Sequence, residues 1–223
     1  MFNLLVLATT NQNKVSEFKQ FVADFPVEIK SLSDFGPLPE AIEDGSTFDE
    51  NAYKKALHYS KVLGIPAIAD DSGLAVEALS GAPGVRSARY AGDDATDQDN
   101  CRKLLAEMKG ETNRKAAFVC VLSIAVPSGP ALTYEASCEG TILDAPRGSN
   151  GFGYDPLFYY ESFGKTFAEI SMEEKNKVSH RGKVLMELSA EFDKVMKWLE
   201  KRVLEEMPEQ PDHTEFEDND WSR

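Results

Sequence analysis

The feature that most constrains the fold is a pair of long strand-like segments joined by a turn. Residues 116–126, AAFVCVLSIAV, are almost wholly apolar. The turn PSGP follows, and residues 131–142 form a second strand-like run, so we expect an antiparallel hairpin. Before the hairpin, shorter apolar strands alternate with helical segments; these strands are expected at residues 4–9, 66–70 and 74–79. Alternation followed by a hairpin predicts a mixed α/β fold.

Helices are marked by apolar periodicity and by capping residues. Apolar residues recur at helical spacing over residues 13–25, and again over a long amphipathic stretch after residue 182. Thr47 and Glu50 form a capping box, which predicts a helix that begins there and stops at Gly64. Residues 207–223 are acidic and weakly patterned, and we expect them to be a disordered or loosely docked tail.

Composition argues against several classes of function. No run of about 18 apolar residues occurs, so no membrane span is expected. The net charge is −14 and no basic stripe accompanies it, which argues against a protein that wraps nucleic acid. A small anionic ligand would need only a local cluster of cations. The three cysteines form no CxxC pair and the N-terminus lacks the features of a signal peptide, so we expect reduced thiols and a cytoplasmic location.

The turn TTNQNK, residues 9–14, links the first strand to the first helix without a glycine. A helix N-terminus carries free N–H groups and partial positive charge, which suit an anion. The hydroxyls of Thr9 and Thr10 and the amide of Asn11 can donate to phosphate oxygens, and Lys14 adds a full charge. An ordinary capped helix start, with Asn11 as the N-cap, explains the same residues equally well.

Two adjacent carboxylates, Asp70 and Asp71, come where an apolar strand is expected to end. The ends of strands are where α/β proteins commonly place ligands. Neighbouring side chains point to opposite faces, so one aspartate is expected to face the site and the other to brace the loop. Carboxylate oxygens suit Mg²⁺. The alternative is an ordinary Asp-rich turn, but the apolar approach and the following Ser72 favour a function.

The glycine-rich stretch GFGYDP, residues 151–156, combines aromatic rings, a flexible backbone and a carboxylate. Phe152 or Tyr154 could stack on a base. Taken alone, however, the stretch is more typical of a connection whose aromatic residues belong to the core.

The stretch KNKVSHRGK, residues 175–183, gathers cationic groups in an acidic protein. Lys175, His180 and Arg181 could donate to phosphate or to base carbonyls. A solvated basic helix end is the alternative interpretation. Arg86 and Arg89 are weaker candidates.

Five blocks together resemble one family. In chain order they are ATTNQNKVSEF, EDGSTFDENAYKKA, ADDSGLAVEALSGAPGVRSARYAG, NGFGYDPLF and KNKVSHRG. This combination is similar to the inosine triphosphate pyrophosphatase family, also called XTP/dITP diphosphatases, over residues 3–200. Asn150 departs from the Gly-Gly pair expected before Phe152, but asparagine tolerates positive φ and the loop can persist.

The resemblance implies an elongated mixed β-sheet flanked by helices, with two lobes, a central active-site cleft and a homodimeric assembly. It implies Mg²⁺-dependent hydrolysis of noncanonical purine nucleoside triphosphates (ITP, dITP and XTP) to the monophosphate and pyrophosphate. Such an enzyme removes deaminated purines from the nucleotide pool. Residues 1–206 would form the two-lobed catalytic domain.

The resemblance also implies roles for residues at matching positions. Asp71 would be the catalytic base, and Asp71 and Glu43 the metal ligands, with nearby Glu40 easily confused with Glu43. The substrate contacts would come from Thr9, Thr10, Asn11, Gln12, Asn13, Lys14, Ser72, Phe152, Gly153, Tyr154, Asp155, Lys175, His180 and Arg181. Donors from His180 or Arg181 would meet O6 of hypoxanthine and reject the amino group of adenine.

Two rival functions remain open from the sequence. One is a hydrolase that releases the terminal phosphate. The other is a nucleotide-binding sensor on the same scaffold without turnover. The intact ADDSG and SHR motifs argue against the sensor, since a sensor has no use for a positioned base.

Overall fold

The computed structural model describes residues 3–206, which are built around one mixed β-sheet. The strands are β1 (Leu4–Leu7), β2 (Glu28–Ser31), β3 (Ala67–Val76), β4 (Lys115–Ala125), β5 (Ala131–Ile142), β6 (Phe158–Tyr160) and β7 (Lys165–Thr166). The helices are α1 (Gln12–Phe21), α2 (Phe48–Leu63), α3 (Asp97–Glu107), α4 (Met172–Val178) and α5 (His180–Glu206). Short 3₁₀ helices are η1 (Leu32–Asp34), η2 (Glu77–Leu79), η3 (Gly84–Arg89), η4 (Glu161–Phe163) and η5 (Phe167–Glu169).

The sheet has the strand order β2-β1-β3-β4-β5-β6-β7 over the described residues. The first three strands are parallel, and each later strand pairs antiparallel with its neighbour. The hairpin expected from residues 116–126 and 131–142 is present as β4 and β5. The sheet is flanked by helices, so the predicted mixed α/β class is confirmed.

One strand was predicted wrongly as two. Residues 66–70 and 74–79 were expected to be separate strands, but β3 runs unbroken from Ala67 to Val76. Every residue of β3 pairs with β4, including Ser72 and Gly73. A Cβ at Gly73 would lie 2.4 Å from Ser87 Oγ, so the glycine accommodates a close neighbour rather than a turn.

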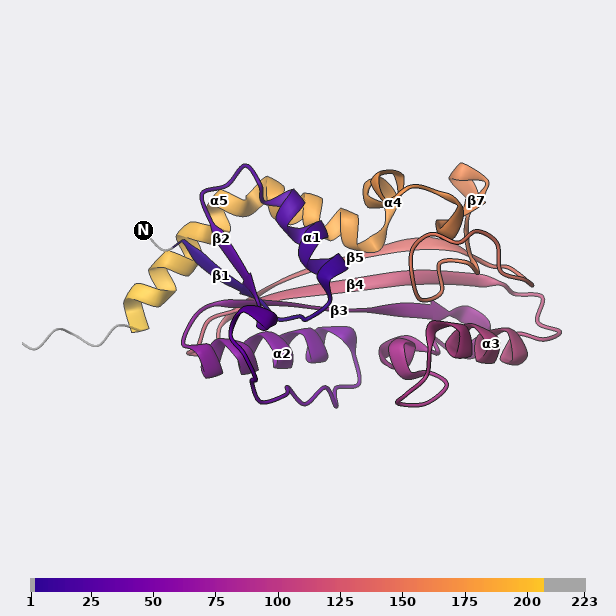
Figure 1. Cartoon of the computed structure of the whole chain (residues 1–223), viewed down its shortest axis with the longest axis horizontal. Coiled ribbons are helices and arrows are strands. Elements are labelled where there is room, and N and C mark those ends of the chain that lie inside the picture. Colours follow the sequence, from indigo (N-terminus) through magenta and orange to yellow (C-terminus); the bar gives the residue numbers. More distant parts are fainter. Residues whose placement is uncertain (1–2, 207–223) are drawn as a thin grey trace, which may run out of the picture.

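Helices cover both faces of the sheet (Figure 1). Helices α1 and α5 lie on one face, whereas α2 and α3 lie on the other. The long strands β3, β4 and β5 run along the longest axis, which makes the molecule elongated. Successive residues of β3 therefore face different helices, and this alternation positions the two aspartates described below.

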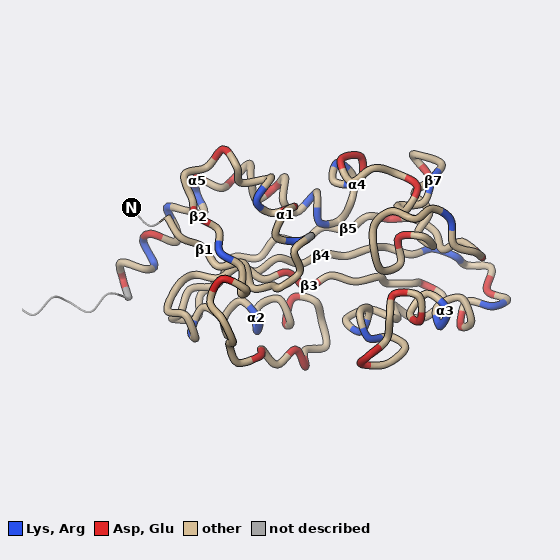
Figure 2. The backbone as a smooth tube through the Cα atoms, viewed as in Figure 1, with Lys and Arg blue, Asp and Glu red and all other residues tan. Residues whose placement is uncertain are grey.

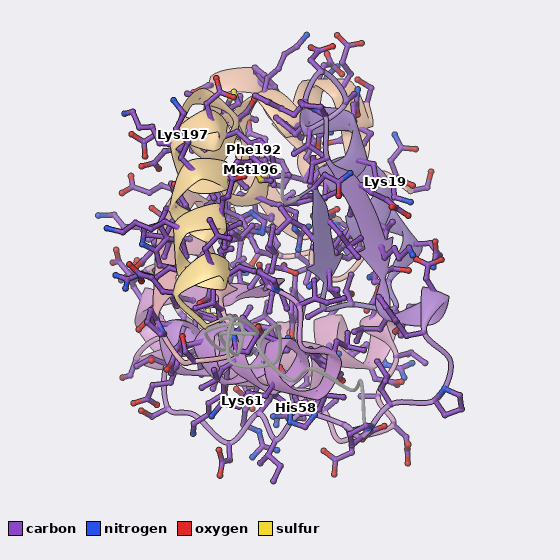
Figure 3. The ribbon with its side chains drawn as sticks, turned by 90° about the vertical axis from the view of Figure 1, so that its left-hand side faces the viewer. Lys19, His58, Lys61, Phe192, Met196 and Lys197 are labelled. Atoms are coloured by element: carbon purple, nitrogen blue, oxygen red, sulfur yellow. The ribbon has the colours of Figure 1, made fainter. Side chains whose placement is uncertain are left out.

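The long helix α5 is held by an apolar stripe. Leu188, Phe192 and Leu199 are almost completely buried in a core cluster shared with β1, α1 and β4. Figure 3 shows Phe192 and Met196 on the side of α5 that faces the rest of the molecule, with Lys197 on the outer side. This arrangement is the amphipathic helix that the spacing of apolar residues predicts.

Helix ends follow the capping residues where these exist. Thr47 Oγ1 accepts from Glu50 N at 3.1 Å, and Gly64 ends α2 in the left-handed conformation. The first helix was predicted to reach residue 25 but ends at Phe21. A turn in which Phe25 N donates to Val22 O follows it, before a proline.

Charges of both signs are interspersed along the described backbone (Figure 2). No helix within residues 3–206 is long and apolar enough to cross a membrane. Cys120 and Cys138 are buried and Cys101 is half-buried, and all three are free thiols. The predicted tail, residues 207–223, lies outside the described residues.

Candidate functional site

The polar turn and the paired aspartates meet at the carboxyl end of β1. This strand pairs with β3 only through Val6 and Leu7, and Ala8 N donates to Ile68 O at 2.7 Å. The chain then leaves the sheet into the turn, while β3 continues through the two aspartates. The aspartates therefore lie within β3, not at its end as predicted, but they do lie beyond the end of a neighbouring parallel strand. That position is a common ligand site in α/β sheets.

The turn itself is a capped helix start. Thr9 Oγ1 accepts from Asn11 N at 3.1 Å, and Asn11 Oδ1 accepts from Lys14 N at 3.4 Å. Thr10 and Gln12 are exposed, and Gln12 Nε2 donates to Thr10 O at 3.4 Å. The N-cap interpretation of Asn11 is thus correct, and it is compatible with an anion at the same helix terminus. The side chain of Asn13 lies outside the described set.

Asp70 is the centre of a buried ion network on the α1 and α5 side of β3. Lys14 Nζ lies 2.9 Å from Asp70 Oδ1, and Arg181 Nη2 lies 3.1 Å from Asp70 Oδ2. Ser72 Oγ donates to the same Oδ2 at 3.1 Å, and Arg181 Nη1 lies 3.3 Å from Glu17 Oε2. Burial alone would raise the pKa of Asp70, but the charges of Lys14 and Arg181 hold it well below its usual range.

Asp71 faces the opposite side of β3, toward α2, and its surroundings are different. Its Oδ1 accepts from Ser72 N at 3.1 Å, whereas its buried Oδ2 accepts no hydrogen bond of normal length and angle within residues 3–206, although the side-chain amide of Asn51 lies close enough to stabilise the carboxylate. Burial raises the pKa of Asp71, and Glu43 acts in the same direction, while Lys55 and Asn51 oppose the shift. A carboxylate with a raised pKa and a free oxygen suits a general base or a hard metal ion.

Lys55 of α2 joins the acidic loop to this face of β3. Its Nζ lies 3.0 Å from Glu43 Oε2 and donates to Asp70 O at 3.2 Å. Lys55 was not among the site residues predicted from the sequence. The signal was its helical spacing, because it lies three residues after Ala52 and four before Tyr59, both of which are buried.

A cavity of about 450 Å³ opens beside the polar turn and this lysine. Thr9 and Thr10 line one part of it, and Glu40, Glu43 and Lys55 line another. Both glutamates that the sequence could not separate therefore border the same space. Arg89 Nη2 donates to Glu43 O at 3.3 Å and so supports this loop, whereas Arg86 is exposed.

The glycine-rich loop contributes a second buried ion pair. Lys175 Nζ donates to Asp155 Oδ2, and both side chains are buried. Phe152 N donates to the same oxygen at 3.1 Å, and Lys175 Nζ lies 4.8 Å from the centre of the Phe152 ring. Burial raises the pKa of Asp155, against the opposing charge of Lys175. The Asp155 carboxylate thus holds both the Lys175 ammonium group and the Phe152 backbone in place beside the Phe152 ring.

The two aromatic residues of this loop have different environments. Tyr154 is 3% exposed in a core cluster, and its hydroxyl donates to Ser87 O at 2.8 Å. The core interpretation, which the sequence favoured for this stretch, is therefore correct for the ring of Tyr154, and Phe152 is the other ring proposed to stack on a base. Phe152 is only half-buried.

The SHR segment connects the two ion networks. Lys175, His180 and Arg181 are 6%, 6% and 9% exposed, so the interpretation as a solvated helix end is wrong. His180 stacks on Phe118 with ring centres 4.9 Å apart. Burial lowers the pKa of His180 well below 6.5, as do the charges of Arg181 and Lys175, so the imidazole is neutral. A Cβ at Gly182 would lie 1.8 Å from Asn176 O, so α4 and α5 approach closely here.

These groups lie close enough together to act on one another's charge. His180 interacts electrostatically with Lys175 of the glycine-rich loop network and also with Asp70 and Lys14 of the β3 network. On the other face of β3, Asp71 interacts with Lys55 and Glu43. Except for Tyr154 and the undescribed side chain of Asn13, the predicted site residues lie in or beside these networks.

Comparison with known proteins identifies the family. The Ham1 family model matches residues 5–191. A dITP/XTP pyrophosphatase of Desulfotalea psychrophila is 65% identical over 223 residues, covering 100% of both chains. One of Syntrophobacter fumaroxidans is 64% identical over 203 residues, 91% of this chain and 88% of the relative. The solved HAM1 protein from Coxiella burnetii has a TM-score of 0.83 at 42% identity and covers 86% of this chain and 100% of its own. The resemblance found in the sequence is thereby confirmed, and the chain belongs to the Ham1 family.

Proposed function

We propose that this chain hydrolyses noncanonical purine nucleoside triphosphates, such as dITP, XTP and ITP, to the monophosphate and pyrophosphate. The full-length identity of 65% to a protein named dITP/XTP pyrophosphatase supports this substrate class. The observation that carries the mechanism is Asp71 Oδ2, a buried carboxylate oxygen that accepts no hydrogen bond within residues 3–206 and lies near the charge of Lys55. The biological role would be removal of deaminated purines from the nucleotide pool.

The phosphates would bind at the polar turn. Lys14 lies in the first turn of α1, where its charge adds to the positive end of the helix. Thr9 and Thr10 line the adjacent cavity with Lys55. Because Lys14 is held by Asp70 at 2.9 Å, its ammonium group is already positioned when the substrate arrives.

Asp71 would act as the general base. Its free Oδ2 would accept a proton from a water molecule, whose oxygen attacks phosphorus in line as the α–β anhydride bond breaks and pyrophosphate leaves. The raised pKa makes Asp71 a stronger base than an exposed aspartate. Lys14 and Lys55 would stabilise the negative charge that develops on the phosphate oxygens.

The acidic groups fit a magnesium ion shared with substrate. Within residues 3–206, no three His, Cys, Asp or Glu side chains are grouped to hold a metal by themselves. Mg²⁺ is commonly held by one or two carboxylates together with substrate phosphates and water. Asp71 and Glu43 would be those ligands, since the charge of Glu43 acts on Asp71. When bound, the ion would neutralise phosphate charge.

The purine ring of the substrate would be recognised by the glycine-rich loop and the SHR segment. Phe152 would stack on the purine, beside the ammonium of Lys175. His180 Nδ1 and Arg181 Nε are buried and meet no acceptor within the described part of the chain, so either could donate to O6 of hypoxanthine. For His180 this requires the tautomer that carries the proton on Nδ1.

We further propose that the enzyme is a cytoplasmic homodimer. The three free cysteines support a reducing compartment, and the homodimer follows from the family resemblance. Light scattering of the full chain would test the assembly: a mass of one chain at micromolar concentration would refute it.

A panel of nucleoside triphosphates assayed with and without Mg²⁺ tests the proposal. We expect pyrophosphate from dITP, XTP and ITP, little from ATP or GTP, and loss of the reaction after chelation. Release of inorganic phosphate instead would indicate a terminal phosphohydrolase. Binding of dITP without any product would indicate a sensor.

A further inference from the structure

We propose that Asp97, in the first turn of α3, is a positioning residue that fixes the Gly153 peptide and thereby the orientation of Phe152. Asp97 lies outside the motifs on which the family resemblance rests. The inference depends on the proposed function only in taking Phe152 as the ring that meets the purine.

Phe152 sits between two glycines that give its backbone little stiffness. Gly151 has φ +74° and Gly153 has φ +60°, both in the left-handed region. Glycine loses more conformational freedom on ordering than any other residue. Hydrogen bonds to this backbone are therefore needed to hold the segment that carries the ring in one conformation.

Two carboxylates from different parts of the chain supply those hydrogen bonds. Asp155 Oδ2 accepts from Phe152 N at 3.1 Å, and Asp97 Oδ2 accepts from Gly153 N at 2.7 Å. Cys101 Sγ donates to Gly153 O at 3.4 Å. Asp97 and Cys101 are four residues apart, on one face of α3, so a single helical turn holds both polar groups of the same glycine.

Asp97 is not needed to cap its own helix. Thr96 and Asp99 form a complete capping box at the start of α3. Asp97 is exposed, and its recorded hydrogen bond is to the loop rather than to α3. A backbone N–H that donates to an aspartate oxygen forms a stronger hydrogen bond than one between neutral groups. The aspartate thus links α3 to the nucleoside end of the site.

The expected consequence is a loss of substrate affinity without a loss of chemistry. Asp97→Ala should raise KM for dITP about tenfold, as expected for a lost hydrogen bond to a charged acceptor. The kcat should stay within about twofold, because Asp71 and Lys14 are held by other contacts. Asp97→Asn should largely restore KM, since its amide oxygen can still accept from Gly153 N.

Asp93→Ala is the matched control. It removes the same charge from an exposed site four residues earlier and should leave KM unchanged. Inhibition by inorganic pyrophosphate, which probes only the phosphate end, should be equal in all variants. A wild-type KM in Asp97→Ala, an Asp97→Asn variant as impaired as Asp97→Ala, or a parallel loss of pyrophosphate inhibition would overturn the proposal.

Hydrogen exchange without substrate supplies a readout that does not depend on activity. The peptide covering residues 150–156 should exchange faster in Asp97→Ala than in the wild type or in Asp93→Ala. Unchanged exchange would overturn the positioning role. If the wild type hydrolysed no dITP, the proposed function would fail, and the exchange experiment would still decide whether Asp97 holds this loop.

Discussion

The two faces of β3 place two adjacent aspartates in opposite environments. On the α1 and α5 face, Asp70 is paired with Lys14 and Arg181, and its pKa is lowered. On the α2 face, Asp71 has a buried oxygen without a described donor, and burial raises its pKa. One strand thus carries a carboxylate held in a buried ion network and another that burial makes easier to protonate. The difference comes from strand alternation and not from residue type.

The opposite shifts imply opposite effects on stability. Asp70 has a lower pKa when folded than when unfolded, so its contribution is present above the unfolded value and is lost as the pH falls. Asp71 has a higher pKa when folded, so its ionisation costs stability as the pH rises. Substitutions at these two positions should therefore separate stability from activity.

The largest expected effect is on turnover. Asp71→Asn should reduce kcat about a thousandfold, the range of a lost general base. Its Tm should be equal to or higher than that of the wild type, because a neutral amide avoids the cost of a buried charge. Steady-state pyrophosphate release and thermal unfolding measure both. Near-normal hydrolysis of dITP or ITP would show that Asp71 is not the base.

Asp70→Asn should instead lower stability. It leaves the buried guanidinium of Arg181 without one of its two carboxylates, and breaking a buried pair costs about 3 kcal/mol. Urea unfolding monitored by circular dichroism measures the change, with the exposed Asp93→Asn as the control. If Asp70→Asn were as stable as the wild type, the network on this face would not be a stabilising one.

Local elements of this fold could be predicted because their signals are local. Thr47 and Gly64 mark the ends of α2 within one residue, and the PSGP turn defines the β4–β5 hairpin. The unbroken β3 could not be predicted, because Ser72 and Gly73 are poor strand formers that pairing with β4 keeps extended. Tertiary contacts overrode the local preference there.

Some features of the candidate site could likewise be predicted from the sequence, and others could not. Residue types at the polar turn and at the paired aspartates point to phosphate and metal chemistry. The two cationic partners of Asp70, Lys14 and Arg181, are separated from it by 56 and 111 residues, so no spacing rule links them to it. Lys55 could have been found from its position on the buried face of a predicted helix, whereas Asp97 gave no signal.

A smaller effect is expected at the phosphate end of the Asp70 network. Lys14→Ala should weaken binding of the triphosphate about tenfold and that of the monophosphate much less, because in the proposed function the lost charge would face the outer phosphates. Inhibition constants for a non-hydrolysable triphosphate and for the monophosphate compare the two. Lys19→Ala, further along α1 (Figure 3), is the control. Equal losses for both ligands would place Lys14 away from the outer phosphates.

The smallest expected effect concerns the pKa of Asp71, which the charge of Lys55 on the α2 face of β3 shifts. Activity should fall on the acid side as Asp71 is protonated. Burial raises the pKa of this carboxyl in the metal-free chain. The charge of Lys55 opposes that shift, so Lys55→Met should move the acid limb of kcat/KM to higher pH.

Lys54→Met is the matched control, because Lys54 pairs with exposed Asp44 instead. A limb that moved equally in both variants would reflect net charge, and a limb that stayed fixed in Lys55→Met would mean that another group limits the rate in acid. Only a shift specific to Lys55 would assign that limb to the carboxylate on this face of β3.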